Sequence, residues 1–171
     1  MRRMEIVSGG TIFRNPSPGH RVDNAYLPCI QQLASGELFC VYRRGTTFYS
    51  IDGVLVHSRS ADGGETWQEE GLVWAPRADG RPYTYSAPFL AELSGSNLVL
   101  AAFRADCSNP DRLLVNPQTG SFVPVETLLF RSTDNGYHWS PPPDHCPSRR
   151  YDCLSGGPSC GTSERSLVSS L

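Results

Sequence analysis

An eight-residue pattern that occurs twice places the strongest constraint on how this chain can fold. Both copies, Ser60–Trp67 and Ser132–Trp139, begin with Ser-x-Asp-x-Gly and end in Trp. Asp at the start of a tight turn accepts hydrogen bonds from later backbone N–H groups, and Gly allows a positive φ. The Trp ring can fold over the hairpin and bury it. The pattern predicts structural turns built from Ser60, Asp62, Gly64, Thr66 and Trp67, and from Ser132, Asp134, Gly136 and Trp139.

Short strand-like runs surround the first turn. We expect strands at residues 10–13, 25–32, 38–43, 53–59 and 68–74, each an apolar-rich stretch bounded by Gly, Pro or polar residues. The chain has 16 Gly and 14 Pro among 171 residues, which favours short strands with many turns over helices. The sequence therefore predicts an all-β fold.

The order of these runs repeats further along the chain. Leu27–Arg44 aligns without gaps with Ala87–Arg104 at an offset of 87 − 27 = 60 residues, with identities at Pro28, Leu33 and Leu38 and at Arg44 itself. The two turns are 134 − 62 = 72 residues apart, so the second unit carries about twelve more residues, within 105–124. The second unit therefore has a longer connection before its turn than the first.

A period of about 60 residues with four short strands is typical of a β-propeller blade. We expect a strand and loop over 1–24, two blades over 25–143 (about 25–80 and 81–143), and a disordered tail over 144–171, where hydrophobic periodicity stops. Two blades fall short of the roughly four to eight that close a propeller. The chain is therefore expected to be a partial propeller from a longer protein.

Charge and composition narrow the range of partners. The formal net charge of −2 favours neither nucleic acid nor an anionic membrane as a partner. No apolar run approaches the roughly 18 residues of a transmembrane helix, and no signal peptide is visible, so the compartment is not predicted. The six Cys form no Cys-x-x-Cys pair, and neither turn has the oxygen ligands of a Ca²⁺ loop. We expect no metal and no cofactor.

The two turns, in hairpins inside repeats of this length, resemble the Asp-box (bacterial neuraminidase repeat, BNR) turns of the sialidase superfamily. The first matches every defined position, and the second has His138 where Thr is usual. The resemblance covers residues 25–140. It implies a six-bladed propeller and a glycoside hydrolase that releases terminal sialic acid, or a related acidic sugar, from a carbohydrate substrate. Asp boxes lie at the blade periphery in this family, so they imply architecture and not catalysis.

Sialidases also carry a first-blade pattern of Tyr/Phe-Arg-Ile-Pro, a Gly turn, a strand that ends in Arg and an Asp before the first box. This chain is similar at Gly36, at Arg43 with Arg44, and at Asp52, but Leu27 stands near the place of the leading Arg. The resemblance implies that the Arg binds the substrate carboxylate through charge-assisted hydrogen bonds and that the Asp protonates the leaving oxygen.

Asp52 is accordingly the candidate catalytic acid, and Arg43 or Arg44 is a candidate substrate ligand. Adjacent residues of a strand face opposite sides, so only one of the two Arg side chains can enter a site. Arg104 and Asp106 follow the repeated strand and are further candidates for substrate contact. A solvated strand-end Arg and a turn-forming Asp are the structural alternatives.

In sialidases the Tyr nucleophile, its Glu partner and the remaining Arg residues belong to later blades. We find no candidate for them here, so this chain alone is expected to be inactive. A non-catalytic Asp-box propeller, acting as a carbohydrate- or protein-binding scaffold, is the alternative. Leu27, in place of the leading Arg, favours that alternative.

Overall fold

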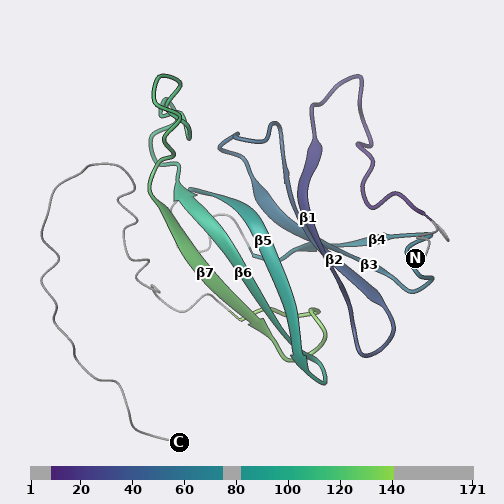
Figure 1. The fold of residues 1–171 in the computed structure, drawn as a ribbon. Helices are drawn as coiled ribbons and strands as arrows, with labels where there is room; N and C mark the ends of the chain where they lie inside the picture. The colour runs from purple at the N-terminus through teal and green to yellow at the C-terminus, as the bar shows by residue number, and fades with distance from the viewer. Residues whose placement is uncertain (1–8, 75–81, 141–171) are drawn as a thin grey trace, which may run out of the picture.

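A computed structural model describes residues 9–74 and 82–140 of the chain. This part contains seven β-strands in two antiparallel sheets and no helix (Figure 1). Sheet A has the order β1 (Asn24–Gln32), β2 (Leu38–Gly45), β3 (Val54–Ser60) and β4 (Gln68–Leu72). Sheet B has the order β5 (Tyr83–Ser94), β6 (Asn97–Asp106) and β7 (Val125–Ser132). The all-β prediction is confirmed.

The four strands that were expected within residues 25–74 all form in sheet A. The prediction of a strand at residues 10–13 is wrong, because the backbone of this segment does not pair with any described strand. Ile12 and Phe13 instead pack their side chains against Cys40, Tyr42 and Val56 on the outer face of sheet A. The apolar pattern of the segment therefore marked burial of side chains and not backbone pairing.

The main core lies between the two sheets. Phe39, Val41 and Leu55 project from sheet A and are at most 2% exposed. Across the interface they meet apolar side chains of β6 and β7, namely Leu98, Leu100, Ala102, Leu128 and Phe130. Removal of this apolar surface from water favours face-to-face packing of the sheets, and within the described residues no strand pairing joins them.

The backbone confirms the offset of 60 residues between the two units. Leu27 and Ala87 both adopt positive φ, 53° and 48°, immediately before a Pro. Each lies at an irregularity of its hairpin, where the register of β1 against β2 and of β5 against β6 shifts. Positive φ is uncommon for residues with a side chain, so the shared conformation shows that the two inner strands bend in the same way.

Sheet B has three strands in the described part of the chain, where four were expected. The backbone N–H of Ser140 donates to Arg131 O at 2.7 Å, which continues the sheet by one residue beyond β7. Residues 141–143, which would have completed the second blade, and the tail at 144–171 lie outside the described residues. Within those described, no helix is long and apolar enough to cross a membrane.

Candidate functional site

The two ends of the sheets carry different kinds of connection. The turn at Ser60–Trp67, the turn at Ser132–Trp139 and the β1–β2 hairpin lie at one end. The connections at 46–53 and 107–124 lie at the other end, because antiparallel strands return the chain there (Figure 1). The second of these is the longer connection that the sequence predicts.

The first turn is held by its own side chains. Ser60 Oγ donates to Asp62 Oδ1 at 2.8 Å and accepts from the backbone N–H of Gly64 at 2.8 Å. The other Asp62 oxygen accepts from the Thr66 hydroxyl at 2.5 Å, and these hydrogen bonds lower the pKa of Asp62 to about 2. Trp67 Nε1 donates to Gly64 O at 3.0 Å. The turn therefore has the geometry that its residue types imply.

The second turn repeats most of this network, with one replacement and one loss. Trp139 Nε1 is buried and has no hydrogen-bond partner among the described residues, unlike Trp67 Nε1. Ser132 Oγ lies 2.8 Å from both Asp134 Oδ1 and the backbone N of Gly136. Where the first turn uses a Thr hydroxyl, the ring nitrogen Nδ1 of His138 lies 2.6 Å from Asp134 Oδ2. His138 thus fills the structural position of Thr, and its departure from the usual pattern does not break the turn. Trp139 packs against Phe39, with ring centroids 6.3 Å apart.

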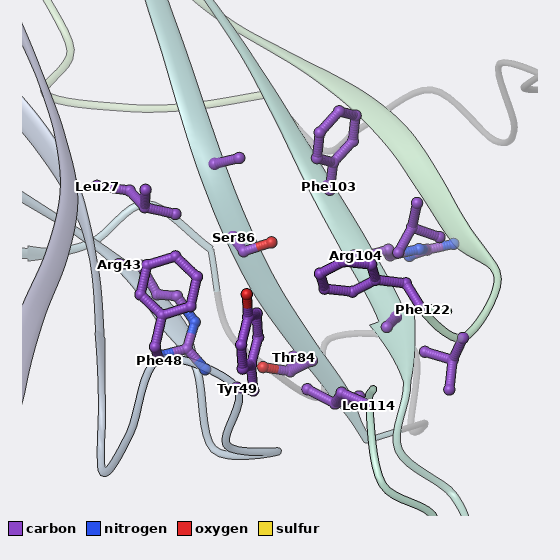
Figure 2. Close-up of a pocket in the computed structure, with 14 residues that line it drawn as sticks. Leu27, Arg43, Phe48, Tyr49, Thr84, Ser86, Phe103, Arg104, Leu114 and Phe122 are labelled. Atoms are coloured by element: carbon purple, nitrogen blue, oxygen red, sulfur yellow. The ribbon is translucent and has the colours of Figure 1, made fainter. Parts of the chain in front are cut away.

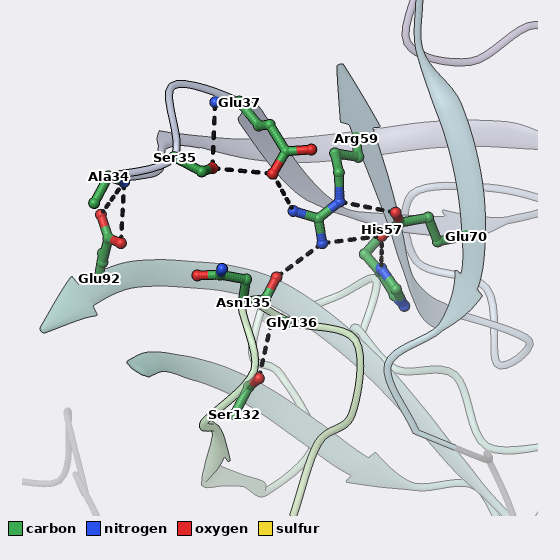
Figure 3. A network of polar contacts seen from close by, with 10 residues as sticks. All are labelled: Ala34, Ser35, Glu37, His57, Arg59, Glu70, Glu92, Ser132, Asn135 and Gly136. Atoms are coloured by element: carbon green, nitrogen blue, oxygen red, sulfur yellow. Dashed lines mark hydrogen bonds and ion pairs between the residues drawn. The ribbon is translucent and has the colours of Figure 1, made fainter. Parts of the chain in front are cut away.

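Arg59 joins the second turn to sheet A (Figure 3). It donates through Nη2 to the backbone oxygen of Asn135 at 2.8 Å and through Nε to Glu70 at 2.8 Å. Glu37 lies 3.4 Å from its Nη1. This buried guanidinium has partners in sheet A and in the second turn, so it fixes that turn against sheet A.

The opposite end contains a cavity of about 380 Å³ between the sheets (Figure 2). Phe48 and Tyr49 of the 46–53 connection form one wall, and Phe122 of the 107–124 connection forms another. Leu27 and Ala87, the two residues with positive φ before Pro, also line it. The bends of both inner strands therefore bring the two connections to a common space.

Aromatic rings form a continuous chain along this wall. Tyr26 packs edge-on against Phe48 at 5.5 Å, Phe48 against Tyr49 at 4.7 Å, and Tyr49 against Phe122 at 5.5 Å between centroids. Edge-to-face pairs of this kind add about 0.5–1.5 kcal/mol each beyond the area that they bury. The chain of rings links sheet A to the long connection of sheet B. Sequence reasoning missed these residues; the cluster at Phe48 and Tyr49 within a turn was the available signal.

Arg43 and Arg44 lie on opposite faces of β2, as strand alternation requires. Arg43 borders the cavity but is only 1% exposed, and its guanidinium donates to Thr47 O and Ser50 O at 2.7 Å each. Burial lowers its pKa, although the nearby Asp52 opposes this effect. Arg43 thus holds the backbone of the 46–53 connection in place.

Gly53 allows Arg43 to occupy this position. A Cβ at residue 53 would lie 2.4 Å from Arg43 Nη2, so any larger residue would displace the Arg43 guanidinium. Arg44 points instead to the outer face of sheet A, where it forms ion pairs with Asp23 at 2.7 Å and Glu69 at 2.8 Å. The hydrogen bonds that Arg44 donates to Asp23 raise the pKa of Arg44.

Asp52 lies at the end of the 46–53 connection and does not line the cavity. Both of its oxygens accept from the backbone N–H of Thr46 at 3.1 Å, and Oδ2 also accepts from the Thr46 hydroxyl at 2.5 Å. Partial burial would raise the pKa of Asp52, but hydrogen bonds from Ser50 and Thr46 outweigh it and lower the pKa. These contacts close a turn; the catalytic role of Asp52 stays a prediction.

The two candidates on β6 also differ in whether they border the cavity. Arg104 borders the cavity, stacks over the ring of Tyr83 at 4.1 Å and donates to Glu126 at 2.6 Å. Asp106 accepts from the backbone N–H of Ser108 at 2.7 Å, beyond the cavity wall. The structure therefore brings Arg43 and Arg104 to one cavity and leaves Arg44, Asp52 and Asp106 outside it. Groups of His, Cys, Asp and Glu that could hold a metal are absent from the described residues.

No protein-family model matches the sequence, and no curated protein sequence matches it. Solved structures that resemble this chain include the following three. A protein of unknown function from Dyadobacter fermentans has a TM-score of 0.56 at 21% identity, over 80% of this chain and 39% of that one. An ulvan lyase, from a new polysaccharide lyase family, has a TM-score of 0.50 at 13% identity, over 68% of this chain and 26% of that one.

The third is an α-L-arabinofuranosidase from Fusarium graminearum, with a TM-score of 0.47 at 18% identity, over 68% of this chain and 31% of that one. This chain therefore spans about two fifths or less of the length of these proteins. The likeness to the first two shows a shared fold.

Proposed function

We propose that the two sheets are adjacent blades of a β-propeller that acts on glycans, and that the cavity belongs to its glycan-binding end. The observation that carries this proposal is the cavity itself, where aromatic side chains from both units meet at the end opposite the Asp-box turns. Ligand sites are concave, mainly apolar and completed by a few polar groups. The similarity to a polysaccharide lyase supports the same class of substrate.

The finer proposal is a sialidase-like glycoside hydrolase that releases a terminal acidic sugar. It rests on the resemblance of both turns to Asp boxes and on the strand-end Arg43 and Arg44 with Asp52. In this proposal the catalytic Tyr and its Glu partner are contributed by parts of the protein outside the two sheets. The candidate roles of Arg104 and Asp106 in contacting substrate belong to the same proposal.

A non-catalytic glycan-binding scaffold is the second candidate. Leu27, near the position of a carboxylate-binding Arg in sialidases, favours it, and so does Arg43, whose guanidinium already donates to two backbone carbonyls. Neither residue offers an uncommitted cation at the cavity.

Two assays on the chain test these proposals. Titration with 3′-sialyllactose, followed by amide NMR, should shift resonances of the 46–53 and 107–124 connections. Tyr49→Ala should weaken binding about fivefold, because one aromatic contact is worth roughly 1 kcal/mol. Phe89→Ala, on the far face of sheet B, is the matched control. Unmoved cavity resonances at saturating sugar would contradict glycan binding.

The second assay is hydrolysis of a fluorogenic sialoside. The chain alone should give no turnover above the blank, since the proposed nucleophile lies outside the two sheets. Turnover would show that these sheets already hold a complete catalytic set, and it would exclude the non-catalytic scaffold.

A further inference from the structure

The charged groups at the cavity are all committed to protein partners. Arg43 donates to Thr47 O and Ser50 O, and Arg104 donates to Glu126. No carboxylate borders the cavity among the described residues. An ionised ligand group placed here would lose its hydration and would meet guanidinium groups whose donors already serve protein carbonyls and Glu126, so that loss is costly.

The rest of the wall is mainly apolar. Leu27, Phe48, Phe103, Leu114 and Phe122 contribute aliphatic or aromatic surface from both sheets (Figure 2). Burial of apolar ligand surface against such a wall is favourable in proportion to the area removed from water. The volume of about 380 Å³ lies near the lower end of ordinary ligand pockets. A dry apolar cavity of about 150 Å³ already holds benzene, so this space has room for an aromatic ring or an alkyl chain together with part of an attached group.

Two hydroxyl groups give this apolar space a polar point of attachment. The side chains of Tyr49 and Ser86 turn into the cavity (Figure 2). Neither hydroxyl makes a hydrogen bond to another group in the described part of the chain. Thr84, by contrast, already donates to Ser50 O at 3.1 Å. Tyr49 and Ser86 can therefore orient a single hydroxyl, ether or carbonyl oxygen of a ligand.

We infer that the cavity binds an uncharged, apolar group, such as the aryl or alkyl aglycone of a glycoside, through the aromatic wall and the Tyr49 and Ser86 hydroxyls. The inference rests on the proposed function only in placing a sugar beside this group. It deepens that proposal because it assigns the cavity to the uncharged part of the substrate. The acidic part of the sugar would then bind elsewhere.

The first test compares benzyl alcohol with benzoate, which differ in charge and share the ring. Amide NMR titration should show benzyl alcohol shifting residues of the cavity, with benzoate binding at least tenfold more weakly. Equal or tighter binding of benzoate would overturn the inference, since it would reveal a usable positive charge in the wall. Absence of shifts with benzyl alcohol would also overturn it.

The second test compares the methyl and phenyl α-glycosides of sialic acid. The phenyl glycoside should bind about tenfold more tightly, because only it carries a ring for the aromatic wall. Equal affinities would overturn the inference and leave glycan binding standing. Binding of benzyl alcohol with no binding of either glycoside would support the apolar site and count against the sialidase proposal.

Two variants make the assignment specific. Phe122→Ala should weaken the binding of benzyl alcohol about tenfold. Phe89→Ala, outside the cavity, should leave the affinity for benzyl alcohol unchanged. Leu27→Arg places a guanidinium at the cavity and should reverse the preference towards benzoate. Far-ultraviolet circular dichroism checks that each variant is folded. If Leu27→Arg does not fold, the comparison of Phe122→Ala with Phe89→Ala still decides, and equal effects of these two would contradict the site.

Discussion

Sheets A and B are copies of one repeat, yet equivalent residues in them have very different surroundings. Leu33 is 3% exposed, whereas Leu93, sixty residues later, is 65% exposed. The face of sheet A that carries Leu33 is covered by sheet B. Among the described residues, no second sheet covers the equivalent face of sheet B. The comparison shows that a repeat specifies which side chains a face presents, while the neighbouring element decides whether they are buried.

The turns at Ser60–Trp67 and Ser132–Trp139 show the same contrast. The hydrogen bonds of their Ser and Asp side chains match, but the two turns contact different neighbours. A Cβ at Gly136 would lie 2.6 Å from the ring of Phe39, so the second turn fits closely against sheet A. A Cβ at Gly10 would lie 2.0 Å from Gly64 O, so the segment before β1 runs against the first turn. Each turn is therefore stabilised by its own side chains, and a different neighbouring segment packs against each one.

The largest expected difference between the repeats comes from their equivalent leucines. Leu33→Ala removes a buried side chain and leaves a cavity, so it should lower the free energy of unfolding by about 2–5 kcal/mol. Leu93→Ala, on the uncovered face, should change it by less than about 0.5 kcal/mol. Urea unfolding followed by circular dichroism measures both. Similar losses for the two variants would show that the face of sheet B is covered in solution.

The next comparison concerns Arg59 and its equivalent 72 residues later, Arg131. Arg59→Ala removes the donor to Glu70 and to the Asn135 carbonyl, and should cost about 1.5–3 kcal/mol. Arg131 is exposed, so Arg131→Ala should cost less than about 0.5 kcal/mol. Thermal unfolding of the two variants under one buffer condition tests this. An equal shift in Tm would contradict the role of Arg59 in joining the sheets.

Acid should weaken both turns in one pH window. The pKa of Asp62 and of Asp134 is lowered to about 2, so each stabilises the fold above its ordinary pKa of about 4. That stabilisation should fall progressively as the pH drops from about 4 through 2. Urea midpoints at pH 6, 4 and 2 measure the slope. Asp62→Asn and Asp134→Asn should each flatten it.

The smallest effect is expected where the two turns differ in sequence. His138→Thr restores the hydroxyl that Thr66 uses in the first turn, so stability should change by less than about 0.5 kcal/mol. His138→Ala removes the contact with Asp134 and should cost about 0.5–1 kcal/mol. Thermal melts near neutral pH compare the two. A loss with Thr as large as the loss with Ala would show that the imidazole has a role beyond the turn.

Local patterns were sufficient for the strands of sheet A and for both turns. Each turn depends on hydrogen bonds between residues at most four positions apart, which a sequence displays directly. The prediction of a strand at residues 10–13 failed, because apolar side chains can be buried without backbone pairing. Opposite faces for Arg43 and Arg44 followed from strand alternation. The partners of these two side chains could not be predicted in this way, since Asp23 lies 21 residues from Arg44 in the sequence.

The cavity shows what a single sequence leaves open. Its wall joins Leu27, Tyr49, Ala87 and Phe122, which come from two strands and two connections. Their meeting depends on how sheet A packs on sheet B, and that packing follows from the core between Phe39 and Phe130 and not from any local pattern. The sequence by itself determined the period, the strands of sheet A and the two Ser-x-Asp-x-Gly turns, because these arise from short-range hydrogen bonds and from the alternation of side chains. Only the tertiary structure decided which faces are covered and which aromatic rings share a cavity, because those contacts join residues far apart along the chain.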